Sequence, residues 1–188
     1  MPNLGAHSLT FLPIDRPGAC QRFFCRIRSR LKFFRSSAVI LDGTIKLDAS
    51  VEKAWAFLID IDKFSTCLPG IDSVTQIDDK TFDGIISATV GPISGKFNFR
   101  STIVESKPPT QMVVKTEGQD TVTKSTIHAD MVVDLRRLSN SQSEMDYKAD
   151  VGIKGRLGIL GDMVLRATAT LILQEFTRRL RKGLAEES

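Results

Sequence analysis

The sequence predicts an α+β fold in which an antiparallel sheet, covered on one side, is followed by a long C-terminal helix. Between residues 71 and 155, apolar and polar side chains alternate in successive segments of strand length. Two short helical patterns precede these segments, and the range 162–182 contains no proline or glycine. The 188 residues are enough for one domain with a hydrophobic core.

The first elements begin where the pattern becomes regular, at Gly43. The segment GTIKLDA alternates as a strand, and Ser50 is placed to cap a helix whose first turn carries Glu52. The apolar stripe of this helix includes Trp55. A second short helix is predicted for residues 60–66, which run into a Pro-Gly pair.

A run of about six antiparallel strands is predicted next. The first hairpin joins residues 82–90 to 97–103, with 91–95 as the connecting loop, and Pro108-Pro109 breaks the chain after it. Further turns are predicted at 118–121 and at 140–142.

The strands on either side of the second turn give the clearest pattern. Residues 127–135 and 145–153 each present one dry and one wet face, as a sheet covered on one side requires.

The last predicted element is a helix over residues 162–182, about 30 Å long at the usual rise per residue. Its predicted buried stripe consists of Leu165, Ala169, Ile172, Phe176 and Leu180, and Gly183 is expected to end it. Three glycines before it, at 155, 158 and 161, are expected to bend the last strand into the helix.

Residues 1–37 differ in kind and are interpreted as an appendage to a domain over 38–188. They hold seven Lys or Arg against Asp15, a net charge of +6. Phe23, Ile27, Leu31 and Phe34 recur at helical spacing, which favours a basic amphipathic helix on an anionic membrane surface. A disordered tail fits the same composition.

Composition and charge exclude several classes of function. The remaining residues carry 19 basic and 21 acidic side chains, so we expect no nucleic-acid partner. The apolar runs are too short for a spanning helix or a good signal peptide, and a cytoplasmic protein, peripheral at the inner face of the cell membrane, is expected. Three cysteines and two histidines give too few ligands for a typical zinc site, so no metal and no cofactor are expected.

Several stretches in this order resemble the CoxG family of carbon monoxide dehydrogenase accessory proteins, which belongs to the START-like (SRPBCC) superfamily. They are LDASVEKAWAFLIDIDKFSTCLPGIDSV, the hairpin VGPISGKF, and GRLGILGDMVLRATATLILQEF, within about residues 39–182. The resemblance implies a helix-grip fold, in which a curved sheet wraps around the long helix and leaves an apolar cavity. One departure is Ile71, which follows the C-x-P-G turn where the family often has a second cysteine.

The resemblance also implies a function. Such a protein is expected to be non-catalytic, to bind a hydrophobic molecule such as a lipoquinone or lipid, and to associate with molybdenum hydroxylase subunits. Membrane recruitment of the enzyme and delivery of an electron acceptor are the expected roles. Two alternatives stay open: a polyketide cyclase or hydratase that uses the same cavity, and an assembly chaperone with a vestigial cavity.

We expect ligand contacts mainly from inward-facing side chains of the sheet and the helices. Tyr147 is the first candidate for a polar contact to a ligand carbonyl, and a hydroxyl satisfied by the backbone is the plainer interpretation. Cys67 is expected to pack rather than react, because His128 falls on the wet face of its strand. The full set is Trp55, Leu68, Phe82, Ile86, Phe97, Phe99, Ser101, Met112, Met131, Tyr147, Leu165 and Ile172.

Overall fold

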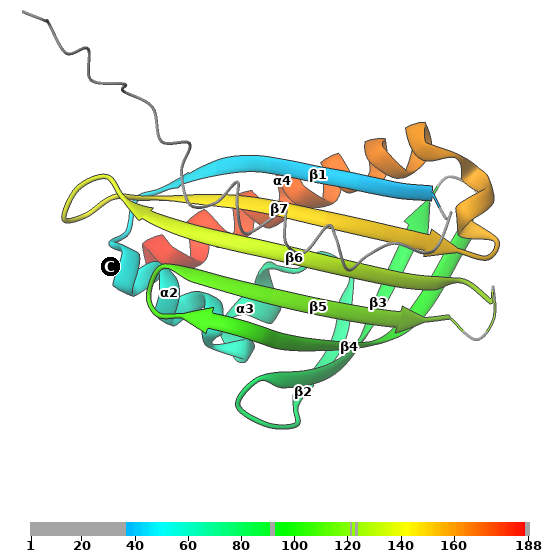
Figure 1. The fold of residues 1–188 in the computed structure, drawn as a ribbon, viewed down its shortest axis with the longest axis horizontal. Coiled ribbons are helices and arrows are strands. Elements are labelled where there is room, and N and C mark those ends of the chain that lie inside the picture. Colours follow the sequence, from blue (N-terminus) through cyan, green and yellow to red (C-terminus); the bar gives the residue numbers. More distant parts are fainter. Residues whose placement is uncertain (1–36, 91–92, 121, 123, 187–188) are drawn as a thin grey trace, which may run out of the picture. The chain divides into compact units, whose positions relative to one another are not determined.

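One antiparallel sheet holds the seven strands of the described residues, in the order β1-β7-β6-β5-β4-β3-β2 (Figure 1). The computed structural model describes residues 37–90, 93–120, 122 and 124–186. The predicted appendage therefore lies outside the described residues, apart from Ser37. The strands are β1 Ser37–Leu47, β2 Ile71–Gln76, β3 Thr81–Val90, β4 Ile93–Lys107, β5 Gln111–Gln119, β6 Thr126–Arg137 and β7 Ser143–Lys154.

The helices are inserted at two points of this meander. Between β1 and β2 lie α2 (Val51–Ile59) and α3 (Ile61–Cys67), and after β7 come the short 3₁₀ helix η1 (Leu157–Leu160) and α4 (Asp162–Glu186). In Figure 1, α4 runs along the sheet and its red C-terminal end lies beside α2. The predicted fold class, a curved antiparallel sheet with a long C-terminal helix, is confirmed.

The two short helices begin where their caps predict. Ser50 accepts a hydrogen bond from the backbone N–H of Lys53, and Asp60 accepts one from the N–H of Lys63. Each bond satisfies one of the amide groups that the first helical turn leaves without a partner. Asp60 is therefore a cap between the helices and not the first residue of α3, as the prediction over 60–66 implied.

Strand β1 begins earlier than the sequence pattern indicated. It starts at Ser37, six residues before Gly43, and pairs with β7 from Ser37↔Ile153 to Leu47↔Ser143. The extra length adds Val39 to the buried residues of the inner face, the face that α4 covers. A single long partner strand, β7, supplies the hydrogen bonds that make this extension regular.

The predicted loop at 91–95 is too long. Strand pairing continues to Val90↔Ile93, so Ser94 and Gly95 belong to β4. The hydroxyl groups of Thr89 and Ser94 lie 3.0 Å apart across this pair. Glycine and serine signalled a turn, but the ladder of hydrogen bonds with β3 outweighs that local preference.

Helix α4 does not end before Gly183 but continues to Glu186. A Cβ atom on Gly183 would lie 2.6 Å from the ring of Phe57, which is buried on α2. The glycine therefore permits close packing of α2 on α4, and it was wrongly expected to stop the helix.

Two groups of buried side chains hold the sheet to the helices. The first cluster gathers where α2 and the end of α4 meet β1, β5, β6 and β7, and it includes Trp55, Met145, Leu180 and Leu184. The second cluster is smaller and joins β1 and β4 to η1 and the start of α4 through Val39, Phe97, Leu157 and Leu165.

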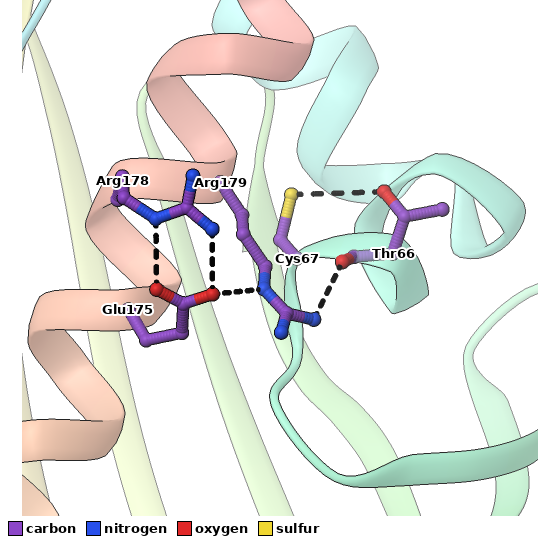
Figure 2. Close-up of polar contacts among 5 residues, drawn as sticks. All are labelled: Thr66, Cys67, Glu175, Arg178 and Arg179. Atoms are coloured by element: carbon purple, nitrogen blue, oxygen red, sulfur yellow. Dashed lines mark hydrogen bonds and ion pairs between the residues drawn. The ribbon is translucent and has the colours of Figure 1, made fainter.

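An ionic contact connects α4 to α3 at the first cluster. Figure 2 shows Glu175 accepting hydrogen bonds from Arg178 and Arg179 on its own helix, with Arg179 Nε 2.6 Å from Glu175 Oε1. Arg179 also donates to the backbone carbonyl of Thr66, at 3.4 Å, on the last turn of α3. The two arginines hold the pKa of Glu175 at about 2, below its ordinary 4.5.

We predict that Leu180→Ala destabilises the domain by about 2–5 kcal/mol, because it removes a buried side chain where α4 meets the sheet. The matched control is Leu171→Ala on the same helix. Leu171 is 66% exposed, so its truncation should change the free energy of unfolding by less than about 0.5 kcal/mol. Urea unfolding measures both, and equal losses would contradict the described packing of α4.

We further predict that Glu175→Gln lowers stability at neutral pH and that this loss disappears in acid. The folded-state pKa lies below the ordinary value, so the carboxylate stabilises the fold fully above pH about 4.5 and loses this effect as the pH falls toward about 2. Urea midpoints of wild type and variant should therefore converge across that window. The control Glu186→Gln removes only the exposed ion pair with Lys182, and a Glu175→Gln difference that stays constant with pH would refute the assignment.

Candidate functional site

The middle of the inner face is formed by one row of side chains that crosses six strands. Cross-strand pairing connects its members from β1 to β3 in an unbroken line. We call it the central row; it consists of Val39, Val151, Ala129, Thr116, Ser101 and Phe82. Val39 and Ser101 are buried, whereas the other four are half-buried although they lie on the face that α4 covers.

Most members of the central row are small. Ala129 and Thr116 are neighbours on β6 and β5, and in the adjacent row Ala149 lies between Leu41 and Met131. Both alanines are half-buried. The large, fully buried side chains belong instead to the two clusters at either end of the helix.

The polar feature of the row is a pair of hydroxyl groups. Ser101 Oγ lies 2.7 Å from Thr116 Oγ1, and either oxygen can donate the hydrogen. One hydroxyl hydrogen of the pair is used in this bond, so the other hydroxyl retains a hydrogen that it can donate elsewhere. This is a neutral, uncharged contact point on an otherwise apolar surface.

Two aromatic rings beside the row lie across glycines of the neighbouring strand. A Cβ atom on Gly43 would be 2.6 Å from the Tyr147 hydroxyl, and one on Gly84 would be 2.5 Å from the Phe99 ring. Both pairs are direct cross-strand partners. Because glycine presents no side chain, each ring can lie flat on the sheet, and it projects less toward α4 than an upright ring would.

Tyr147 is the one tyrosine of the chain, and its hydroxyl points toward β1. Burial raises the pKa of this phenol, and the Asp42 carboxylate raises it further. The side chain therefore stays protonated at neutral pH and can donate a hydrogen bond. It packs against the first cluster, next to the central row.

The predicted contact residues divide into three groups. Phe82, Ile86, Phe99, Met131 and Tyr147 are half-buried on the inner face, and Leu68 is half-buried at the end of α3. Trp55, Phe97, Met112 and Leu165 are buried within the two clusters, and Ser101 is buried in the central row. Ile172 is 41% exposed on α4.

Sequence reasoning did not select Thr116, Ala129 or Ala149 as site residues. The alternation of β6 and β7 already placed the two alanines inward, so the signal was present for them. Thr116 could have been reached by extending the pattern of Met112 and Val114 along β5. Its pairing with Ser101 depends on the register of β4 against β5, which is shifted by a bulge between Ile103 and Glu105.

Cys67 is buried where α3 ends, and burial raises the pKa of its thiol. Figure 2 shows its Sγ beside the hydroxyl of Thr66, at 4.0 Å. His128 lies on the outer face of the sheet, 3.6 Å from Glu117 and 3.7 Å from Asp130, as the strand parity predicted. The histidine is therefore on the opposite side of the sheet from the thiol and is not a base for it.

Two searches of the described part of the chain gave negative results. No three side chains of the metal-binding types gather into a potential site there. None of the described helices is both long and apolar enough to cross a membrane.

Solved structures with the same fold come from several bacteria. A conserved protein from Geobacillus kaustophilus is 22% identical, with a TM-score of 0.73 over 79% of this chain and 96% of that one. A START superfamily protein from Mycobacterium smegmatis is 12% identical, with a TM-score of 0.62 over 79% and 99%. The Zhui aromatase/cyclase from a Streptomyces species is 10% identical, with a TM-score of 0.60 over 79% and 94%.

These likenesses establish a START-like fold. A search of curated proteins finds no match to the sequence. The model of one family, carbon monoxide dehydrogenase CoxG, matches residues 43–185, which include α2, the whole meander from β2 to β7, and nearly all of α4. The chain therefore belongs to the CoxG family of carbon monoxide dehydrogenase.

Proposed function

We propose that this protein is an accessory subunit that binds a hydrophobic molecule on the inner face of its sheet, under α4. The observation that carries the proposal is the contrast along that face. Both ends are closed by buried clusters, whereas the central row between them is small-sided and half-buried. Apolar, concave surfaces with few polar groups are typical of ligand sites.

A lipoquinone is the ligand class that this surface suits best. Its isoprenoid tail needs an apolar lining, which Phe82, Phe99 and Met131 supply, and its ring carbonyls need neutral donors. Tyr147 and the Ser101–Thr116 pair are candidate donors beside the row. A charged group in the same position would favour an ionic ligand instead.

Family membership supports a molybdenum hydroxylase of the carbon monoxide dehydrogenase type as the partner. In this role the protein would deliver the electron acceptor to the enzyme or hold the enzyme near the membrane. The basic segment 1–37 remains our candidate for a contact with anionic lipid.

The alternative is an enzyme of the cyclase or hydratase kind, since aromatase/cyclases share the fold. Tyr147 would then act as the general acid. A second catalytic group beside it has no support, because the inner-face neighbours Gly43 and Val133 on the adjacent strands have no titratable side chain.

We predict that protein purified from its native host carries an extractable isoprenoid or lipid that mass spectrometry detects. Ala149→Phe should abolish uptake of ubiquinone or menaquinone, because the added ring fills the middle of the inner face. The control Thr75→Phe adds the same ring to an exposed position of β2 and should leave uptake unchanged. An empty wild-type protein that takes up neither quinone would contradict the proposal.

We also predict that Cys67→Ser is mild in every assay, because the buried thiol has no base and serves only in packing. Thermal unfolding and quinone uptake should stay close to those of wild type. A correctly folded Cys67→Ser or Tyr147→Phe protein that lost turnover of an identified substrate would favour the enzymatic alternative.

A further inference from the structure

Large apolar side chains are unusually exposed where η1 joins β7 to α4. Ile159 on η1 is 82% exposed, and Met163 in the first turn of α4 is 84% exposed. Val122, in the loop after β5, is 82% exposed. Surface apolar side chains are common singly, but three with such exposure at one place call for a physical explanation.

Contacts between backbone segments bring these residues to one end of the domain. The N–H of Leu157 donates to Ser125 Oγ at 3.1 Å, and Gly155 is packed against the carbonyl of Lys124. In Figure 1 the orange start of α4 lies at the end of the sheet where β7 finishes. We call this region the tip; it comprises Asp120, Val122, Lys124–Ser125 and residues 154–166.

The tip is also basic. Its exposed cations are Lys124, Lys154, Arg156 and Arg166, and its exposed carboxylate is Asp162, since Asp120 is buried. Residues 38–188 as a whole have 19 basic and 21 acidic side chains. Positive charge is therefore concentrated around the exposed apolar side chains, while the rest of the domain is acidic.

The tip is fixed to the body of the domain by its inner side. Leu157 and Leu165 are buried in the second cluster with Val39 and Phe97, and Leu160 packs against them. Arg166 Nη1 donates to the carbonyl of Ile40 on β1 at 3.3 Å. The same short segment thus has a buried apolar side and an exposed apolar side.

From this arrangement we propose that the tip docks on an anionic lipid bilayer. Ile159 and Met163 enter the boundary between headgroups and acyl chains, and the surrounding lysines and arginines contact lipid phosphates. The apolar side chains project from a loop, a 3₁₀ turn and a helical turn, each beside a cation, and do not form one flat apolar face. That pattern matches an interface with phosphates above and hydrocarbon below.

The inference assigns a second lipid contact, within the folded domain and separate from the appendage 1–37. It extends the proposed function, because a lipoquinone resides in the bilayer. Its evidence and its test do not require a bound ligand. Vesicle binding without quinone uptake would refute only the proposed function, and the reverse result would refute only this inference.

The test uses the full chain with vesicles of equal phosphatidylglycerol and phosphatidylcholine, compared with vesicles of phosphatidylcholine alone. We expect co-sedimentation with the anionic vesicles that falls as salt is added. The double variant Ile159→Ser/Met163→Ser should bind at least about tenfold more weakly, since two apolar side chains no longer enter the bilayer. The control, Ile77→Ser/Leu138→Ser, alters two exposed apolar residues in the β2–β3 and β6–β7 turns and should bind as wild type does.

A fluorescence measurement separates the tip from the appendage. The chain's one tryptophan, Trp55, is buried, so Met163→Trp adds a reporter whose quenching by lipids brominated on their acyl chains registers insertion. We expect quenching of Met163→Trp and none of Leu138→Trp. Absence of vesicle binding, full binding by the double serine variant, or an unquenched Met163→Trp bound to vesicles would each overturn the proposal.

Discussion

The structure depends on one helix covering the concave face of a seven-stranded sheet while packing tightly only at its two ends. At the C-terminal end, Leu180 and Leu184 are buried, Gly183 admits the ring of Phe57, and Arg179 connects the helix to the end of α3. At the other end, Leu165 is buried beside η1. Burial at both ends fixes the helix over the sheet without filling the middle.

This constraint explains why the middle of the face has its particular composition. Small side chains in the central row and rings laid across Gly43 and Gly84 keep side-chain volume low under the helix. The clusters at the ends supply the apolar burial that stabilises the fold. Stability and ligand binding are thus assigned to different parts of one face, and half-exposed Ile172 lies on the helix between the two ends.

Much of the fold was predictable from the sequence because its signals are local. Alternation in β6 and β7, the Ser50 cap and the uninterrupted range 162–182 each report a single element. Errors arose where a distant partner decides the outcome: β7 extends β1, β3 extends β4, and Phe57 requires Gly183. The Ser101–Thr116 pair depends on a strand register set by a bulge, so the sequence pattern alone could not bring these two residues together.

The account's central claim is that a hydrophobic ligand occupies the middle of the inner face, and the methionines can test it. With methyl-labelled methionine, Met131 reports the middle, Met145 the first cluster and Met163 the exposed tip. Titration with a short-chain ubiquinone, followed by methyl NMR, should shift Met131 strongly and leave Met145 and Met163 nearly unchanged. Bound quinone that leaves Met131 unshifted, or that shifts Met163 alone, would contradict the claim.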